Sequence, residues 1–360
     1  MKKLIALLLA VLMVAACVGC ASKTNDSKQN TTDDKQTTDN TEAQKPADEQ
    51  HRAAFITSTA RGNEFIDLIW DGFLDLEKEG WEVKCIECFE TAEQAEQIYS
   101  MCEEGYDLIY SNGDDIKKAI EDLGSELNDA YPNVHFFFLD TYEDPQIDNA
   151  TSVTIDPFEA CFIAGYLAAL VTEKETIGIM MPLDDAIMAR FENGYYAGIE
   201  YANREEGLNK KWVKAYTNSW SDTTKGYEAA VAMNSNYDID LIIHCAYISG
   251  YGVISACSDL GLKCIGVDGW QGYVDPCVFW SAIKSMNVAV LKTAHAWENG
   301  EELPMHLEYS VKDGGEAYYD LENLSPELQE KVVALRDKIV SGEVDVFSNG
   351  YEEYRVTSNN

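Results

Sequence analysis

Polar and aromatic side chains gather directly after the strand-like apolar runs of this sequence, and their types suit recognition of a small molecule. The first such run is followed by Arg61, Asn63 and Phe65. Later runs are followed by further carboxylate, amide and aromatic side chains: Asn112, Asp140, Trp220, Tyr247, Asp268 and Trp270. Ligands of parallel sheets bind beyond the carboxyl ends of the strands. Aromatic walls with carboxylate and amide edges suit a flat, hydroxylated molecule that is uncharged or cationic.

The same residues offer little for catalysis. No Gly-x-Ser-x-Gly or His-Glu-x-x-His motif is present, and the five histidines are scattered along the chain. One enzymatic alternative is a carboxylate pair, Asp140 with Asp268, that hydrolyses a glycosidic bond. Cys85 and Cys88 have the spacing of half a zinc or redox site, but no second pair completes it. We therefore expect a binding protein with no catalytic residues, no metal and no cofactor; the sequence also lacks the P-loop pattern of an ATP site.

The elements that must position these side chains alternate between strands and helices. Apolar runs of strand length occupy 53–57, 81–88, 108–110, 135–139, 152–155, 176–181, 212–217, 241–246 and 264–267. Runs with helical length and period occupy 64–79, 91–104, 116–131, 158–172, 188–204, 224–235, 252–260 and 287–300. This alternation predicts an α/β protein with two parallel sheets, each covered by helices on both faces.

The amino-terminal segment predicts export. Lys2 and Lys3 precede about 13 apolar residues, which are too few to span a bilayer of about 30 Å. Small residues then lead to Cys17 and Cys20, and either cysteine fits a bacterial lipobox. We expect residues 1–20 to be a lipoprotein signal peptide with its lipobox and 21–50, which are almost free of apolar side chains, to be a disordered tether. The mature protein would then be lipid-anchored on the outer face of a bacterial cell membrane.

The charge of the chain excludes one large class of partner. Lys and Arg number 27 against 63 Asp and Glu, a formal net charge of −36, and no basic cluster follows the signal segment. A protein that binds nucleic acid needs a basic surface to meet the phosphates. We therefore expect no nucleic-acid partner, and the membrane contact should rest on the lipid.

Several motifs, in order and spacing, make the chain resemble the basic membrane protein (BMP) family. They are Gly62-Asn63-Glu64-Phe65, Trp70-Asp71-Gly72, Gly165-Tyr166-Leu167-Ala168, Phe191-Glu192-Asn193-Gly194, Ala197-Gly198, Gly266-Val267-Asp268, Ser281-Ala282-Ile283-Lys284 and Ser341-Gly342-Glu343-Val344. The family comprises lipoprotein substrate-binding components of ABC importers, and characterised members bind purine nucleosides. The resemblance implies a type I periplasmic-binding-protein fold, a permease and its ATPase as partners, and a small-molecule ligand.

The resemblance also implies lobes and a hinge. Residues 51–155 plus 285–303 would form the amino-terminal lobe, and 156–284 plus 304–350 the carboxy-terminal lobe. Three chain crossings, near Ile155-Asp156, Ile283-Lys284 and Leu303–Leu307, would join them. The lobes would then close on the ligand about a three-strand hinge.

Family members stack the base on aromatic side chains that fall on Phe65 and Trp220 here. They hold the ribose hydroxyls with an aspartate and a lysine that fall on Asp268 and Lys284. Two segments depart from the family pattern: Arg61-Gly62-Asn63-Glu64-Phe65-Ile66 replaces Asn-Asp-Lys-Ser-Phe-Asn, and Asp268-Gly269-Trp270-Gln271 replaces Asp-x-Asp-Gln. A purine nucleoside is therefore the first expectation. The alternatives are a free base, a modified nucleoside or a sugar, or a signalling receptor of the same fold without a transporter.

Overall fold

The structure is a computed structural model, and it describes residues 50–314, 316–318 and 321–346. The predicted signal peptide, both candidate lipidation cysteines (Cys17 and Cys20) and nearly all of the predicted tether lie outside the described residues. No helix within the described ranges combines the length and apolar character that crossing a bilayer requires. Asp48–Asn360 forms one compact unit, so a chain that starts there carries both sheets described below.

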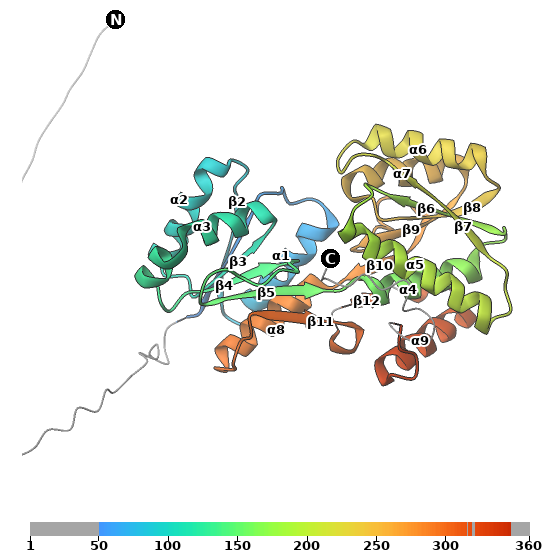
Figure 1. Ribbon diagram of the computed structural model, residues 1–360. Coiled ribbons are helices and arrows are strands. Elements are labelled where there is room, and N and C mark those ends of the chain that lie inside the picture. The colour runs from blue at the N-terminus through green and yellow to red at the C-terminus, as the bar shows by residue number, and fades with distance from the viewer. Residues whose placement is uncertain (1–49, 315, 319–320, 347–360) are drawn as a thin grey trace, which may run out of the picture. The chain divides into compact units, whose positions relative to one another are not determined.

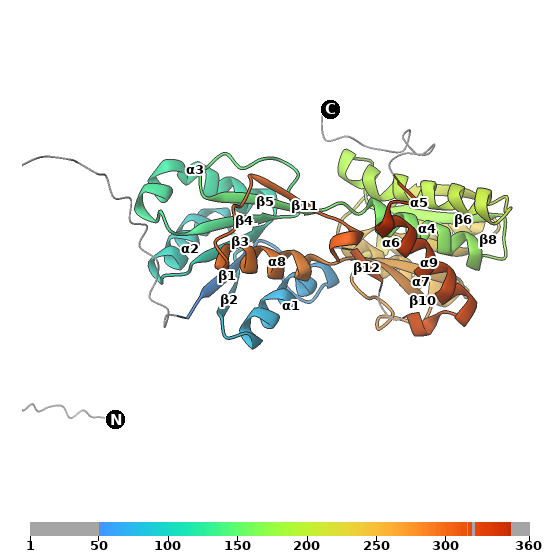
Figure 2. The ribbon, with the colours of Figure 1, turned by 90° about the horizontal axis from the view of Figure 1, so that it is seen from below.

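The first sheet has six parallel strands in the order β11-β5-β4-β3-β1-β2. Its strands are β1 (Arg52–Thr57), β2 (Glu82–Glu87), β3 (Leu108–Asn112), β4 (His135–Leu139), β5 (Ala150–Ile155) and β11 (His306–Tyr309). Its helices are α1 (Glu64–Lys78), α2 (Thr91–Glu103), α3 (Asp114–Ala130) and α8 (Met286–Glu298). Alternate residues of β1 point to opposite faces, so Phe55 packs with α1 and α8 while Ile56 packs with α2 and α3 (Figure 2).

The second sheet repeats this design. Its order is β12-β10-β9-β8-β6-β7, and every pairing is parallel except that of the short β12 with β10. The strands are β6 (Thr176–Met181), β7 (Lys211–Tyr216), β8 (Ile239–His244), β9 (Lys263–Asp268), β10 (Val278–Lys284) and β12 (Glu316–Tyr318). The helices are α4 (Phe158–Val171), α5 (Ala186–Glu205), α6 (Thr223–Asn236), α7 (Gly250–Leu260) and α9 (Pro326–Ser341). Figure 1 shows α6 and α7 on one face and α4, α5 and α9 on the other.

Helices α4 and α5 approach each other unusually closely, because two glycines of the family-like motifs lie in their contact. A Cβ on Gly165 would lie 2.2 Å from the Tyr195 carbonyl oxygen, and one on Gly198 would lie 2.0 Å from the Phe162 carbonyl oxygen. Larger residues at either position would push the helices apart. Helix α4 is buried almost all round, so these motifs serve packing in the second lobe.

The chain crosses between the two sheets three times. The first crossing follows β5 at Asp156-Pro157, and the second follows β10 at Ser285. The third follows Tyr309, because β11 adds to the first sheet beside β5 before the chain reaches β12 of the second. This corrects the expected boundary: residues 306–309, assigned from sequence to the carboxy-terminal lobe, belong to the first sheet, and the third crossing lies beyond Leu303–Leu307.

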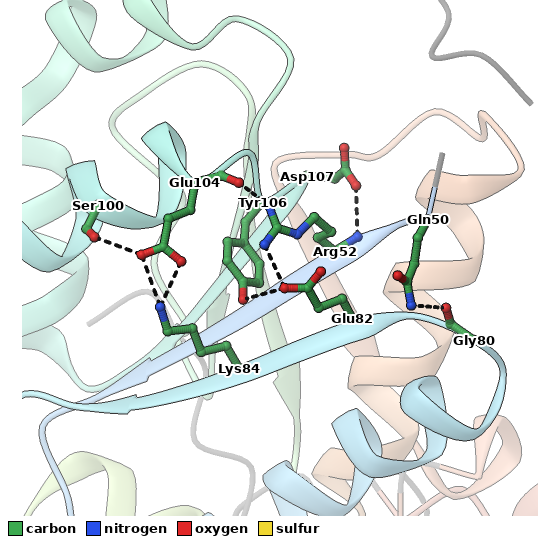
Figure 3. A network of polar contacts seen from close by, with 9 residues as sticks. All are labelled: Gln50, Arg52, Gly80, Glu82, Lys84, Ser100, Glu104, Tyr106 and Asp107. Carbon is green, nitrogen blue, oxygen red and sulfur yellow. Dashed lines mark hydrogen bonds and ion pairs between the residues drawn. The ribbon is translucent and has the colours of Figure 1, made fainter. Parts of the chain in front are cut away.

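A polar network fixes the amino end of β1, where the predicted tether joins the lobe (Figure 3). The backbone N–H of Arg52 donates to Asp107 (2.9 Å), and its guanidinium donates to Glu82 (2.6 Å). The same guanidinium lies over the ring of Tyr106, 4.4 Å from its centre. Gln50 donates from its side-chain amide to the carbonyl of Gly80 (2.8 Å). The described chain therefore begins at a position fixed by hydrogen bonds, at the amino ends of the strands and away from their carboxyl ends.

Candidate functional site

Asp268 is the most constrained polar residue at the carboxyl edge of the second sheet. It ends β9 with a φ of 65°, and the N–H of Gly269 donates to the carbonyl of Val267 (2.8 Å), which closes a γ-turn around it. A positive φ at an aspartate costs free energy, and such strain is typical of functional positions. The side-chain oxygen of Gln271 accepts from the backbone N–H of Val267 (3.1 Å). The backbone N–H of Gln271 donates to the hydroxyl of Ser281 (3.1 Å). The turn is thus held from two sides, and it aims a carboxylate away from the strand.

The charge state of Asp268 is also unusual. Burial raises the pKa of this carboxyl, the ammonium of Lys284 opposes that rise, and the carboxylates of Asp140 and Glu64 add to it, so that the net pKa is about 7. A carboxylate whose charge is poorly solvated gains free energy when hydroxyl groups donate hydrogen bonds to it. Asp268 is therefore suited to accept hydrogen bonds from a polyhydroxylated ligand.

Tyr247 lies beside Asp268 in a short 3-10 turn, Tyr247–Ser249, after β8. It also has a positive φ, 49°, and burial raises the pKa of its phenol to about 12, so the hydroxyl stays a donor at neutral pH. The ring of Trp220 lies edge-on to it, with centroids 6.4 Å apart and planes at 74°. Trp220 is 41% exposed, and the carbonyl of Trp220 accepts from the Ser249 N–H (3.0 Å).

The first lobe contributes the start of α1. Asn63 is the N-cap of this helix: its side-chain oxygen accepts from the Ile66 N–H (3.1 Å), and its amide donates to the Ala60 carbonyl (2.8 Å). The capped turn holds Phe65, whose ring is half-buried against the hydrophobic core between the first sheet and helices α1 and α8. Both polar groups of the Asn63 side chain are therefore occupied by local structure, which leaves the ring of Phe65 as the group in this turn that could contact a ligand.

These elements meet in one pocket. Its lining comprises Asn63, Glu64 and Phe65 from the first lobe and Tyr247, Ile248, Tyr251, Val267, Asp268 and Gln271 from the second. Four residues predicted from the sequence, Asn63, Phe65, Tyr247 and Asp268, therefore line the same pocket. Glu64 and Tyr251 were not predicted: Glu64 departs from the family pattern, but nothing local in the sequence indicates that either residue lines a pocket.

The other predicted residues do not line this pocket, and three of them lie in separate places. Arg61 pairs with Glu87 (3.8 Å), and its guanidinium lies over the ring of Trp70. Asn112 ends β3, where its side chain is buried and its oxygen accepts no hydrogen bond within the described part of the chain. The ring of Trp220 contacts that of Tyr247, which lines the pocket, but Trp220 itself does not line it.

The remaining predicted pair, Asp140 and Lys284, joins the two lobes at the hinge. Lys284 ends β10 with 3% of its side chain exposed, and its ammonium pairs with the carboxylate of Asp140, which follows β4 with a φ of 59°. Burial lowers the pKa of Lys284, but Asp140 and the nearby Tyr142 outweigh it, so the net shift is upward and the lysine stays charged. The pair thus links the carboxyl ends of strands from different sheets.

Two hinge residues were missed by the sequence analysis. Arg190 of α5 donates to Asp156 at the first crossing (2.7 Å), and its guanidinium lies 4.1 Å from the centre of the Tyr142 ring. The ammonium of Lys284 lies 5.8 Å from the same ring. Tyr142 therefore sits between two cations at the hinge. No sequence signal marks Arg190, because its partners are distant in the chain.

Within the described residues, no three His, Cys, Asp or Glu side chains come together as metal ligands. The pocket combines an aromatic surface, a phenol donor and a carboxylate acceptor. Such a set can bind and orient a small molecule.

Comparison with known proteins gives a consistent result. The family model of PnrA-like ABC transporter substrate-binding proteins matches residues 50–349. The chain is 31% identical over 289 residues to basic membrane protein B of Borreliella burgdorferi, covering 73% of this chain and 80% of that protein. It is 26% identical over 375 residues to a CD4+ T-cell-stimulating antigen of Listeria innocua, covering 96% and 98% of the two chains.

Solved structures share the fold at lower identity. A solute-binding protein of an ABC transporter system from Aeropyrum pernix K1 matches with a TM-score of 0.65 and 22% identity, over 84% of this chain and 95% of that one. A solute-binding protein from Conexibacter woesei matches with a TM-score of 0.68 and 18% identity, over 82% and 98%. These neighbours confirm the periplasmic-binding-protein fold with two parallel-sheet lobes.

Proposed function

The chain belongs to the family of PnrA-like ABC transporter substrate-binding proteins, and from this premise we propose that it captures a purine nucleoside between its two lobes. In this proposal it is a lipid-anchored, extracytoplasmic receptor that delivers the ligand to a membrane permease driven by an ATPase. The observation that carries the proposal is the shared pocket, in which Phe65 of the first lobe faces the same space as Tyr247 and Asp268 of the second.

The chemistry of the pocket supports a flat ligand with vicinal hydroxyls. Phe65 offers an aromatic face for a base, and Trp220 adds a second ring near the pocket's edge. Asp268 can accept from two hydroxyls, and Lys284 has donors beyond the one given to Asp140. These are the roles that the family resemblance assigns to the four residues.

The balance of charge argues against an anionic ligand such as a nucleotide. The carboxylates of Asp268, Glu64 and Asp140 all lie at or beside the pocket, and Lys284 is already paired with one of them. A phosphate would meet uncompensated negative charge in a partly desolvated site. A neutral nucleoside avoids this cost.

Capture proceeds in this account by closure about the hinge. Contacts to both lobes stabilise the closed form in proportion to the ligand's preference for it over the open form. The predicted tether precedes β1 at the amino end of this strand, and the pocket lies beyond the carboxyl ends of the strands. A tether attached at Cys17 or Cys20 would keep the closed protein within reach of the permease.

A ligand screen tests the proposal. The chain from Asp48 onward is exposed to nucleosides, free bases, sugars, amino acids and thiamine-like cations, and its melting temperature and heat of binding are measured. A ligand that binds only the folded state must raise the melting temperature. A shift with inosine, guanosine or adenosine and none with the free bases is expected. A response confined to another class of compound would leave the family assignment intact and would overturn the proposal that the ligand is a nucleoside.

Two alternatives have their own tests. Prolonged incubation with nucleoside should return it intact, whereas release of free base would indicate hydrolysis by the Asp140 and Asp268 carboxylates. Permease and ATPase genes beside the coding gene are expected for an importer, and a sensor kinase in their place would favour a signalling receptor.

A further inference from the structure

Both carboxylate oxygens of Glu64, in the first turn of α1, are occupied by tyrosine hydroxyls from the other lobe. Tyr251 of α7 donates to Oε2 (2.7 Å), and Tyr273, in the segment after β9, donates to Oε1 (2.6 Å). Glu64 lies in the first lobe, and both tyrosines lie in the second. One carboxylate therefore ties two separate segments of the second lobe to the helix that carries Phe65.

The backbone around this contact is shaped for close approach of the lobes. A Cβ on Gly269 would lie 2.7 Å from the Cβ of Glu64, so only glycine fits at that position in this arrangement. Gly269 follows Asp268 directly, and its N–H closes the turn that strains the aspartate. The first-lobe helix therefore rests against the segment that aims Asp268 into the pocket.

The two segments that meet here are the two in which the sequence departs from the family pattern. Glu64 stands where that pattern has a serine, and Gly269-Trp270 lies in the altered segment after Asp268. A serine hydroxyl is too short to accept from two tyrosines on another lobe and carries no charge to strengthen the bonds.

We propose that Glu64, Tyr251 and Tyr273 form a clasp that fastens the closed lobes and positions Asp268, so that Glu64 raises ligand affinity without contacting the ligand. The effect on affinity rests on the proposed function, whereas the clasp itself should also shift the ligand-free protein from open towards closed lobes. In the open form Glu64 and Tyr251, both partly buried here, become more exposed, whereas Tyr273 is already 68% exposed. The phenols keep their protons at neutral pH, since burial and the Glu64 carboxylate raise the pKa of Tyr273 to about 12 and that of Tyr251 further.

The test compares variants of the chain from Asp48 onward in calorimetry and stopped-flow dissociation, with inosine, guanosine and adenosine as probes. Tyr251→Phe and Tyr273→Phe each remove one hydroxyl and keep the ring. Tyr251→Phe should raise the dissociation constant about tenfold and Tyr273→Phe, whose side chain is 68% exposed, only about threefold, mostly through faster dissociation, because a hydrogen bond to a charged group is lost only in the closed form. Tyr227→Phe is the matched control: its hydroxyl donates to Asp259 (3.0 Å) within the second lobe, and its removal should leave binding unchanged.

Glu64→Ala separates the clasp from direct ligand contact. In the wild-type background it should weaken binding about as much as both tyrosine changes together. In the Tyr251→Phe, Tyr273→Phe background it should add nothing, since its partners are already gone. A further loss there would show that Glu64 contacts the ligand and would overturn the clasp, as would tyrosine variants that bind like the wild type.

A measurement without ligand separates the clasp from the proposed function. Small-angle scattering should show that the ligand-free double tyrosine variant is more expanded than the wild type, while Tyr227→Phe matches the wild type. If no nucleoside binds the wild-type protein, the proposed function fails, and this comparison still decides the clasp. Identical scattering curves would overturn it.

Discussion

The two edges that face the pocket use their polar residues differently. In the first lobe, Asn63 caps α1 and Arg61 pairs with Glu87, so both side chains are engaged in the lobe's own structure. In the second lobe, Tyr247 and Asp268 have positive φ angles and shifted pKa values, and their polar groups face the pocket.

The difference indicates that the two lobes have different roles at the pocket. Backbone strain of this kind persists only where the surrounding structure enforces it. We therefore expect the second lobe to supply the polar recognition, and the first lobe to supply the aromatic surface of Phe65 and the carboxylate of Glu64. Substitutions on the two edges should differ in kind: changes at Tyr247 and Asp268 should act on binding, changes at Asn63 and Arg61 mainly on local stability, and Glu64, which bonds to the second lobe, is the exception.

The largest effect is expected at the hinge, where the two edges are joined. Lys284→Met leaves Asp140 without its cation and should lower the free energy of unfolding by about 3 kcal/mol, the lower end for a buried pair because Asp140 is 29% exposed. Urea unfolding measures it. Lys263→Met, at the exposed amino end of β9, is the control and should cost less than about 0.5 kcal/mol. Equal losses of unfolding free energy in the two variants would show that the Lys284–Asp140 pair does not stabilise the hinge.

Asp268→Ala tests the second-lobe edge directly. It removes the acceptor for the ligand's hydroxyls and should weaken nucleoside binding by at least about 2 kcal/mol, about 30-fold in dissociation constant. Calorimetry measures the loss, and a thermal melt checks that the protein is folded. Asp259→Ala, an exposed second-lobe aspartate outside the pocket, should bind normally. An unchanged constant for Asp268→Ala would remove Asp268 from the site.

Asn63→Ala tests the first-lobe edge. Loss of the N-cap should cost about 1 kcal/mol of folding free energy, with a smaller effect on affinity through the position of Phe65. Ser325→Ala, which removes the N-cap of α9, should cost a similar amount and leave affinity unchanged. Should Asn63→Ala weaken binding more than it weakens folding, the first lobe would share in polar recognition.

The smallest effect is expected at Arg61. Its guanidinium is 43% exposed, pairs with Glu87 at 3.8 Å and lies outside the pocket's lining. Arg61→Ala should therefore change the dissociation constant less than twofold, and it should cost less than about 0.5 kcal/mol of stability, as exposed ion pairs usually do. A large loss of affinity in calorimetry would mean that this side chain leaves Glu87 for the ligand.

Much of the fold is readable from the sequence, because each long element has its own period. The strand expected at 135–139 is β4, and the helix expected at 158–172 matches α4 to within one residue. The short β11 and β12 were missed, since four and three residues carry no recognisable pattern. The sequence analysis also missed two longer elements, β10 and α9. The place of β11 in the first sheet depends on pairing with β5, about 150 residues earlier, which local sequence does not encode.

The site was only partly readable for the same reason. Phe65 and Asp268 follow strands, so their position was evident once the strands were assigned. The N-cap role of Asn63 had a local signal, an asparagine before a helical run, that outweighs a ligand role for its amide. The partners of Glu64 lie 187 and 209 residues away, and only the folded chain brings them together.

The pH dependence of binding tests most directly whether the second lobe holds the ligand through Asp268. Lys284, Asp140, Glu64 and Tyr247 surround this carboxyl, whose pKa in the free protein is about 7. Ligand hydroxyls that donate to the carboxylate lower that pKa, so binding should release a proton and weaken as the pH falls through 7. For adenosine, we expect the dissociation constant of the wild type to be about tenfold higher at pH 6 than at pH 8. The dissociation constant of Asp268→Asn should be the same at both pH values. Equal affinity of the wild type at both pH values, with no proton released, would contradict it.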